Sequence, residues 1–491
     1  MATTPPAVVC VDVGSTWTKA ALVGGDGVLL ATSSHVTTPP EVLDGIAAAV
    51  AGLGPVPAGT TTLACSSAGG GLRLAVVGQE PLVSAEAGRR VALSAGARVV
   101  HVRAGSMTGA DVRALRASRP DVVLLVGGTD GGDARTLLHN AARLAANRLA
   151  VPIVLAGNAA ARDDALALLR STGRTVVVAA NVLPDVGELN PGPAREAIRA
   201  VFLDHVIGGK KLSRGPRLRR LVRLVTPDAV LVGVGRLAAV LARRQPIAAG
   251  PAPSGPALPG AALSSAALPG AALSWAARAE DAQAGAVLVV DVGGATTDVY
   301  SAVSDPPEPQ RHAVALPAQR RTVEGDLGMR ISAPGVVTEA LTERLISDHE
   351  ADALLAAAHH RAANPSWVPV AIDPAAGAAV DARFAALAAV LAVRRHLRMI
   401  DGQLGPHGAG LLVLSGGVFR HATPEALASM TAVLRDDPVL RPILRHAAIR
   451  VDADYVLAPA GLLADSGHSG TADALLTRLT TPAPSMNSTP R

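Results

Sequence analysis

The segment DVGSTWTK, which begins at Asp12, carries residue types that could hold the phosphates of a nucleotide. Nucleotide hydrolysis needs hydrogen-bond donors around the phosphates, a divalent cation and a positioned water molecule. Asp12 follows an apolar run and could hold Mg²⁺ through water, because Mg²⁺ keeps much of its hydration shell. Gly14 lets the backbone approach closely, and Ser15 and Thr16 can donate to phosphate oxygens. An ordinary β-hairpin turn can carry the same pattern, so this segment alone leaves both interpretations open.

Lys19, in the same segment, could neutralise phosphate charge or pair with an acid elsewhere. Only Lys19, Lys210 and Lys211 are lysines, although the chain has 45 lysine and arginine residues together. A lysine in so arginine-rich a chain indicates a position that needs a compact ammonium charge, which a guanidinium cannot imitate. We therefore predict that Lys19 binds phosphate.

A near copy of this segment occurs 279 residues later in the chain. Val8–Ala20 (VVCVDVGSTWTKA) and Val287–Val299 (VLVVDVGGATTDV) share six identities in thirteen positions. A chance match of two turns could do this, but identity concentrated on Asp and Gly favours a duplicated unit. We predict that Asp12 and Asp291 are the catalytic, Mg²⁺-holding carboxylates of two facing loops. The second copy adds these predicted phosphate-binding residues: Gly293, Gly294, Thr296 and Thr297.

A third element, GLLVLSGG, ends in Ser415, Gly416 and Gly417 after an apolar run. Bare glycine backbone and a helix N-terminus at this point could lie against an adenosine. The three elements in this order predict that ATP and Mg²⁺ bind in a cleft between two related halves.

The elements that must position these residues follow an α/β pattern. Apolar runs alternate with helical segments from residue 121 to 180, which indicates a parallel sheet covered by helices. We expect a first half at 1–285, with an inserted α/β subdomain at about 75–250 and a low-complexity linker at 251–280. A second half at 286–467 and a disordered Ser/Thr/Pro-rich tail at 468–491 follow.

Composition bounds the class of protein. Hydrophobic residues make up 49% of the 491 residues and charged residues 17%, as in globular proteins. No apolar run approaches the roughly 20 residues that span a bilayer, and no signal-like segment opens the chain, so we expect a cytoplasmic protein without a membrane role. The basic cluster Lys210–Arg223 has no aromatic residues between its charges. This favours a solvated face over a patch that binds nucleic acid or an acidic partner.

The order and form of the motifs resemble those of the superfamily of actin, the heat-shock chaperones, sugar kinases and acetate kinase. Within it, residues 7–465 resemble the MutL/GlmL proteins associated with adenosylcobalamin-dependent glutamate mutase. Further blocks carry this similarity: Leu124–Asp133 (LLVGGTDGGD), Asn181–Pro184 (NVLP), Arg321–Arg330 (RTVEGDLGMR) and Tyr455–Leu463 (YVLAPAGLL). The resemblance implies an actin-like ATPase fold, with two ribonuclease-H-like halves around a nucleotide cleft and the inserted subdomain.

The resemblance also implies a function. It is that of an ATP-dependent chaperone or reactivating factor for an adenosylcobalamin-dependent mutase of the glutamate mutase type. ATP binding and hydrolysis would be coupled to the exchange of damaged cobalamin, and the partners would be the mutase subunits. Neither the mutase that is served nor the oligomeric state follows from the sequence.

Three other functions stay open. A metabolite kinase on the same fold would need a substrate pocket with a general base, which the sequence does not identify. An activator of 2-hydroxyacyl-CoA dehydratases would need cysteines for an iron–sulfur cluster, and the chain has only Cys10 and Cys65. A scaffold could bind nucleotide without turnover.

Four other acidic residues lie in conspicuous loops. Glu324 and Asp326 could orient the attacking water, although a salt bridge within their loop is favoured. Asp130 and Asp133 could bind a second ligand, although a helix N-cap is favoured, because Asp often precedes a helix.

Overall fold

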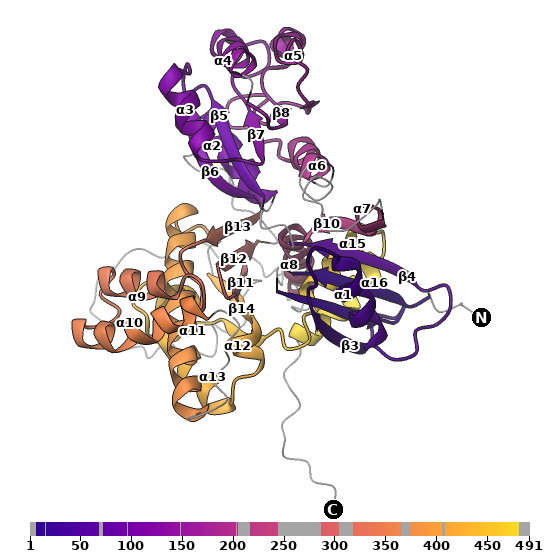
Figure 1. Cartoon of the computed structure of the whole chain (residues 1–491), viewed down its shortest axis with the longest axis vertical. Helices are drawn as coiled ribbons and strands as arrows, with labels where there is room; N and C mark the ends of the chain where they lie inside the picture. Colours follow the sequence, from indigo (N-terminus) through magenta and orange to yellow (C-terminus); the bar gives the residue numbers. More distant parts are fainter. Residues whose placement is uncertain are drawn as a thin grey trace, which may run out of the picture.

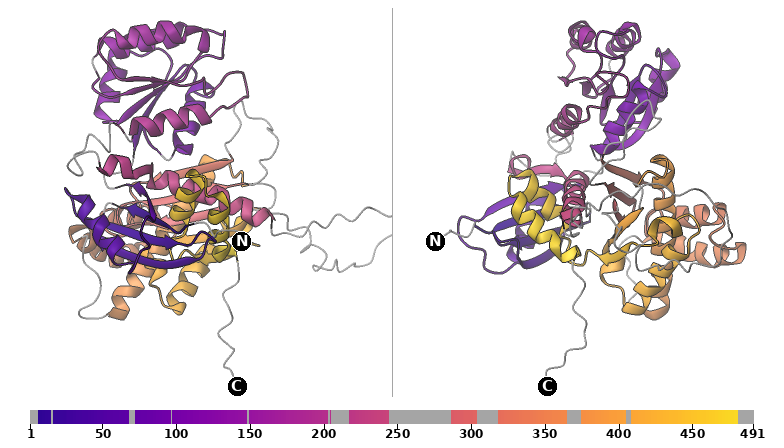
Figure 2. Two further views of the ribbon diagram at one scale, coloured as in Figure 1. Left: turned by 90° about the vertical axis from the view of Figure 1, so that its right-hand side faces the viewer. Right: turned by 180° about the vertical axis from the view of Figure 1, so that it is seen from behind.

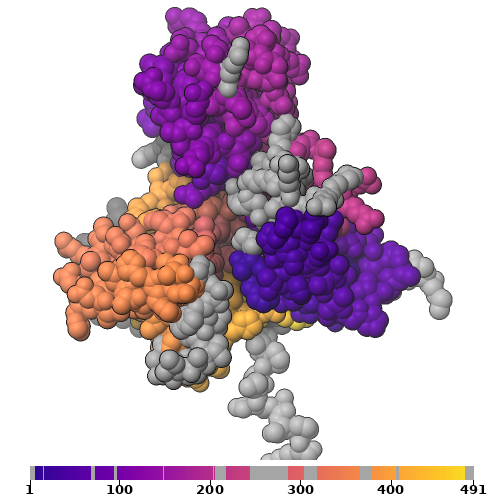
Figure 3. Space-filling view, viewed as in Figure 1, coloured from indigo at the N-terminus to yellow at the C-terminus, as the bar shows by residue number. Residues whose placement is uncertain are grey.

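The computed structural model describes residues 6–14, 16–67, 72–95, 97–147, 149–202, 204, 217–243, 286–303, 318–364, 374–404 and 408–480. The expected linker at 251–280 lies outside the described residues, as do Ser15 and Lys210–Pro216 of the basic cluster. Three lobes make up the described molecule (Figure 3). Two lie side by side below, and the third stands above them (Figure 1).

The first lobe is built on a five-stranded sheet in the order β10-β4-β1-β2-β3. β1 is antiparallel to β2 and parallel to β4, β2 is antiparallel to β3, and β10 is parallel to β4. β1 reads as a continuous apolar run because both of its faces are covered. Its strands are β1 (Val8–Val13), β2 (Trp17–Val23), β3 (Leu29–Val36), β4 (Thr61–Ser66) and β10 (Val222–Val225).

The second lobe repeats this sheet. Read in the same direction as the first, its order is β15-β14-β11-β12-β13. Each strand pair has the same direction as its counterpart in the first sheet. The strands are β11 (Ala286–Val292), β12 (Thr297–Ala302), β13 (Gln319–Glu324), β14 (Ala409–Ser415) and β15 (Ala448–Val451). Two ribonuclease-H-like halves of the same topology form the actin-like ATPase fold, as the sequence predicted.

The third lobe is inserted between β4 and β10, and Figure 2 shows it from two further sides. Its sheet is parallel throughout, in the doubly wound order β6-β5-β7-β8-β9. The strands are β5 (Arg73–Gly78), β6 (Arg98–Ala104), β7 (Val122–Leu125), β8 (Ile153–Leu155) and β9 (Val176–Val178). The helices are α2 (Ser84–Ser94), α3 (Gly109–Ala117), α4 (Arg135–Ala146), the 3-10 helix Ala159–Ala161, α5 (Arg162–Arg170) and α6 (Gly192–Val201).

The insertion is shorter than the sequence predicted. We expected it to run to about residue 250, but β10 already pairs with β4 of the first sheet. α7 (Arg217–Leu221) precedes β10, and α8 (Thr226–Arg243) follows it. Because a short apolar strand such as VRLV has no pattern of its own, its membership of the first sheet becomes visible only in the fold.

Helices cover both halves. α1 (Val42–Ala51) packs on the first sheet, in a core shared with α2 and β5 of the insertion. The second sheet is covered mainly by α9 (Ala333–Thr342), α10 (Asp348–Ala363), α11 (Pro374–Met399) and α13 (Pro424–Asp436). The short helices α12 (Gly417–Arg420) and α14 (Arg441–Leu444) complete this half.

The two sheets face one another across a common core. α8, α15 (Leu457–Asp465) and α16 (Ser469–Thr480) pack there against β1 of the first sheet and β11 of the second. α16 corrects our expectation of a disordered tail from residue 468. Its buried residues Ala472, Leu475, Leu476 and Leu479 recur at the spacing of one helix face. Residues 481–491 lie outside the described part.

α8 and α15 touch through their backbones. A Cβ atom on Gly461 would stand 1.8 Å from the carbonyl oxygen of Ala229. A Cβ atom on Gly233 would stand 2.2 Å from the carbonyl oxygen of Leu457. Because real Cβ contacts are never this short, only glycine permits the crossing of the two helices.

We predict that Gly461→Ala destabilises the protein. The methyl group would force α15 away from α8, at a cost of about 1–3 kcal/mol. Thermal unfolding followed by circular dichroism should show a lower midpoint. Gly470→Ala, in α16, is the matched control, because a Cβ there meets no atom within 4 Å. Equal midpoints for the two variants would contradict the crossing.

Candidate functional site

A cavity of about 310 Å³ lies between the two sheets. Asp12 and Lys19 of the first half line it, together with Asp291 and Ser415 of the second. The structure therefore brings these four predicted residues to one place. Further polar lining residues are ones to which the sequence analysis gave no role in the site: Thr32, Ser33, Ser34, Thr226, Arg420, Asp452, Asp454 and Tyr455.

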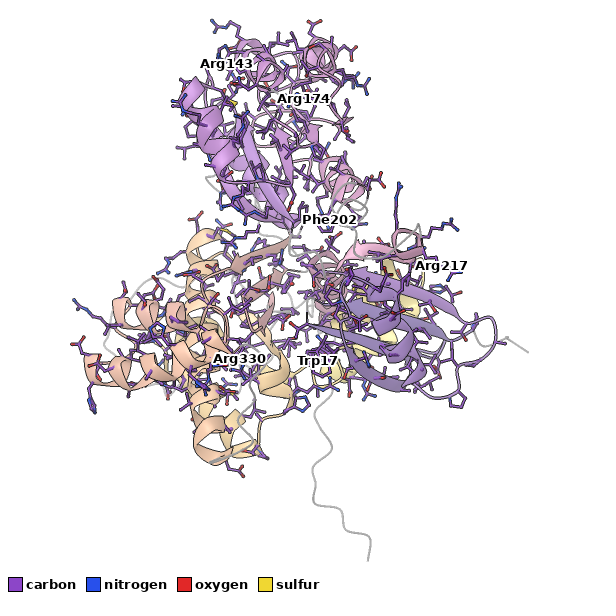
Figure 4. The ribbon with its side chains drawn as sticks, viewed as in Figure 1. Trp17, Arg143, Arg174, Phe202, Arg217 and Arg330 are labelled. Atoms are coloured by element: carbon purple, nitrogen blue, oxygen red, sulfur yellow. The ribbon has the colours of Figure 1, made fainter. Side chains whose placement is uncertain are left out.

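The two duplicated hairpins have the same turn. The amide of Gly14 donates to the carbonyl of Trp17 at 3.0 Å, and the amide of Gly293 donates to that of Thr296 at 2.9 Å. A Cβ atom on Gly14 would stand 2.6 Å from the Trp17 carbonyl oxygen, so this turn requires glycine. The exposed ring of Trp17 lies on the side of the first half that faces the second (Figure 4).

Asp12 is held by three neighbours. Its Oδ1 accepts the Thr226 hydroxyl at 2.5 Å and the Cys65 thiol at 3.6 Å. Its Oδ2 lies 3.9 Å from Nζ of Lys19. Thr226 is the first residue of α8, so this carboxylate joins the first sheet to the helix that runs between the halves.

Lys19 keeps its charge in the cavity. Burial lowers the pKa of its ammonium group, but Asp12, Tyr455 and Asp291 raise it by more, so the pKa is above its usual value. The ammonium group also lies 3.8 Å from the centre of the Tyr455 ring.

The surroundings of Asp291 do not fully stabilise its negative charge. Burial raises its pKa, the charge of Lys19 and a hydrogen bond from Ser415 lower it, and the charges of Asp298 and Asp12 raise it further. The outcome is a raised pKa, because the carboxylate lacks full compensation. A cation brought into the cavity would supply what is missing.

Asp452 and Tyr455 are functional candidates that the sequence analysis missed. Asp452 is buried and accepts the amides of Val456 and Leu457 at 2.8 and 3.3 Å, at the start of α15. Burial raises its pKa to about 6, against these two hydrogen bonds. Tyr455 has φ of +53°, a left-handed conformation that is rare for a bulky residue. An Asp ahead of an apolar helix is a capping signal, but it does not show that the cap faces a cavity.

The remaining predicted residues are not among those that line the cavity: Gly14, Thr16, Gly293, Gly294, Thr296, Thr297, Gly416 and Gly417. For Thr297 the predicted phosphate contact is wrong. Its side chain is completely buried, and its hydroxyl donates to the carbonyl of Leu327 at 2.6 Å. Gly416 has φ of +116°, and a Cβ atom there would stand 2.4 Å from the carbonyl oxygen of Val292. It therefore lies against the start of the second hairpin.

The block RTVEGDLGMR supports the second hairpin. The amides of Met329 and Arg330 donate to the carbonyls of Gly293 and Gly294 at 3.0 and 2.7 Å. The hydroxyl of Ser332 donates to the carbonyl of Ala295 at 2.7 Å. With the amide of Ile331, which also donates to the carbonyl of Gly294, and the contact from Thr297, five hydrogen bonds fix the backbone of this loop. The sequence pattern did not reveal them.

Glu324 and Asp326 do form a salt bridge, but its partner lies on α11 and not within their loop. Both carboxylates lie 2.8 Å from Nη1 of Arg395.

Neither acid of the GGTDGGD loop is the N-cap residue of α4 that we expected. Asp130 does not cap α4, because it accepts the amides of Ala159 and the Asn181 side chain, each at 2.8 Å. Asp133 accepts the amide of Arg135 at 3.0 Å, beside the start of α4.

The donor set of the cavity fits Mg²⁺ that arrives with phosphates. Among the described residues, no three His, Cys, Asp or Glu side chains form a cluster that could hold a metal ion. Asp12 and Asp291 could instead hold water molecules of a Mg²⁺ shell that phosphates help to complete. None of the helices that the structure describes has the length and apolar character to cross a membrane.

We predict that Asp452→Asn changes the pH dependence of stability. Because the folded pKa of Asp452 is raised, its contribution is fully present below about pH 4 and is lost as pH rises through 6. The free energy of unfolding of the wild type, minus that of the variant, should fall by up to about 3 kcal/mol over this range. Urea denaturation at several pH values measures it. Asp163→Asn, on the surface of α5, is the control. Parallel curves for wild type and Asp452→Asn would contradict the raised pKa of Asp452.

Comparison with known proteins agrees with the resemblance drawn from the motifs. The chain matches the family model described as MutL protein over residues 8–248 and 260–479. Protein MutL of Clostridium tetanomorphum is 31% identical over 488 residues, which cover 94% of this chain and 96% of that protein.

Solved structures are more distant. A nucleotide-free acetone carboxylase has 16% identity and a TM-score of 0.37, over 87% of this chain and 67% of that one. A ROK family glucokinase from Streptomyces griseus, in complex with glucose and AMPPNP, has 14% identity and a TM-score of 0.28, over 95% and 98% of the two chains. Likeness at this level does not bear on activity. The family match and the relative from Clostridium tetanomorphum show that the chain belongs to the MutL protein family.

Proposed function

We propose that the chain binds ATP with Mg²⁺ in the cavity between its halves and hydrolyses it to ADP and phosphate. One observation carries this proposal. Asp12 and Asp291 occupy equivalent positions in the two duplicated hairpins and line the same cavity, with the charge of Lys19 acting on both. Duplicated carboxylates around one ammonium group are suited to a metal–polyphosphate ligand, whose two components have opposite charges.

In this proposal each residue has a task of its own. Lys19 neutralises phosphate oxygens, and Asp12 and Asp291 hold water molecules of the Mg²⁺ shell. Bound Mg²⁺ would supply charge neutralisation on the transferred phosphate. The fixed backbone of the hairpins at Gly14 and Gly293 would offer amides to the phosphates. We also keep Ser415, Gly416 and Gly417 as the adenosine-facing segment of the site.

Hydrolysis would be coupled to movement of the halves. Asp12 holds α8 through Thr226, and α8 crosses α15, which belongs to the second half of the chain. A ligand that draws Asp12 and Asp291 together would act on both helices. Such closure around a ligand is how nucleotide state changes the shape of two-lobed proteins.

We further infer that this movement serves an adenosylcobalamin-dependent mutase of the glutamate mutase type. Membership of the MutL family supports a mutase partner, and the ATP-driven exchange of damaged cobalamin is proposed by resemblance. The activator of 2-hydroxyacyl-CoA dehydratases is less well supported, because Cys10 and Cys65 are both buried and are not presented to a second subunit.

We predict that Asp12→Asn and Asp291→Asn each lower ATP turnover at least about a hundredfold, the usual effect of removing one electrostatic group from such a site. Phosphate release measures turnover, and circular dichroism checks that the fold is retained. Asp163→Asn, on the surface of α5, is the matched control. Turnover at the wild-type rate in both site variants would refute the assignment, and phosphate found on a small acid or sugar would favour a kinase.

We predict that the protein restores a glutamate-mutase-type enzyme that damaged cobalamin has blocked. Blocked mutase would be incubated with the protein, ATP, Mg²⁺ and fresh adenosylcobalamin, and mutase activity measured. Recovery should require ATP and be lost with Asp12→Asn. An active ATPase that restores no mutase activity would remove the reactivating role and leave the ATPase assignment standing.

A further inference from the structure

Tyr455 binds two cations from different parts of the chain. Nζ of Lys19, on β2, lies 3.8 Å from the centre of its ring, and the guanidinium carbon of Arg420, at the end of α12, lies 4.7 Å from it. Both distances are within the range of cation–π attraction. The ring therefore joins the first half to two segments of the second, inside the cavity that all three residues line.

The ring is held in place by the backbone. Tyr455 has φ of +53°, and its amide donates to the carbonyl of Asp452. The Asp452 carboxylate binds the next two amides and thereby starts α15. A strained residue that surrounding contacts impose is typical of functional sites. Movement of the ring would thus be passed directly to the first turn of α15.

We propose that Tyr455 is a positioning residue that holds Lys19 while the cavity is empty and releases it to the phosphates of the nucleotide. This inference rests on the proposed ATP binding and deepens it. The ammonium group has Asp12 on one side and the ring on another. Phosphate oxygens attract an ammonium group more strongly than a neutral ring does, so nucleotide would displace the ring from Lys19.

Release of Lys19 would couple nucleotide binding to the position of the Tyr455 ring. Arg420 already lies over the ring, so the ring would keep one cation when Lys19 leaves and could move towards it. Because Tyr455 lies two residues before the start of α15, and α15 crosses α8 at two glycines, the change would reach the contact between the halves.

The chain is well suited to test this, because it has only two tyrosines. Full-length protein labelled with 3-fluorotyrosine should give two ¹⁹F resonances, and Tyr455→Phe assigns them by removing one. ATP with Mg²⁺ should shift the Tyr455 resonance. Tyr300, which is buried beside Arg321 in the second sheet, is the internal reference and should stay in place. Lys19→Met should shift the Tyr455 resonance even without nucleotide.

Affinity gives an independent readout. Tyr455→Leu keeps an apolar side chain but frees Lys19 from the ring, so calorimetry should show ATP with Mg²⁺ bound about fivefold more tightly, the equivalent of one cation–π contact. Tyr455→Phe keeps the ring and should restore the wild-type affinity. A stationary Tyr455 resonance at saturating nucleotide, or equal affinities for the Leu and Phe variants, would overturn this inference alone. No nucleotide uptake by the wild type would overturn the proposed function and this inference with it.

Discussion

Carboxylates from both halves of the chain meet around the ammonium group of Lys19, and their charge has to be balanced. Lys19 stays protonated because Asp12 and Asp291 act on it together. The balance is incomplete, since the pKa values of Asp291 and Asp452 are both raised above their usual range. A divalent cation would complete it, which is why the ligand we propose brings positive charge together with phosphates.

The duplication of the hairpins explains why this cavity lies between the two sheets. Their divergence in sequence explains why the two sides of the cavity carry different charges. Asp12 pairs in register with Lys19, whereas Asp291 pairs in register with Asp298. Asp298 is in turn bound by Arg321, next to the loop that supports the second hairpin. The cation of the first copy, Lys19, therefore lines the cavity, whereas the cation beside the second copy, Arg321, is bound to Asp298.

The duplicated hairpins could be predicted because their chemistry is local: Asp, Gly and hydroxyl residues follow one strand within a few positions. Asp452, Tyr455 and Arg420 could not, since nothing near them in the chain indicates that α15 starts at the cavity. Thr297 was misassigned because it follows the second Asp-Gly turn closely, although its side chain is completely buried in β12. The helix α16 was missed because Ser and Thr dominate the composition around it and obscure the helical spacing of its apolar residues. In each case tertiary packing decided what local pattern left open.

The contact between α8 and α15 shows how a change in the cavity can reach the whole molecule. Helices that touch through Gly233 and Gly461 have no side chains between them to absorb a displacement. At one end α8 is bound to Asp12 through Thr226, and α15 starts at the cap made by Asp452. Both helices therefore begin at the cavity and meet in the core between the sheets. A close-packed interior transmits a shift of this kind, so these contacts offer a route for the movement of the halves that we propose.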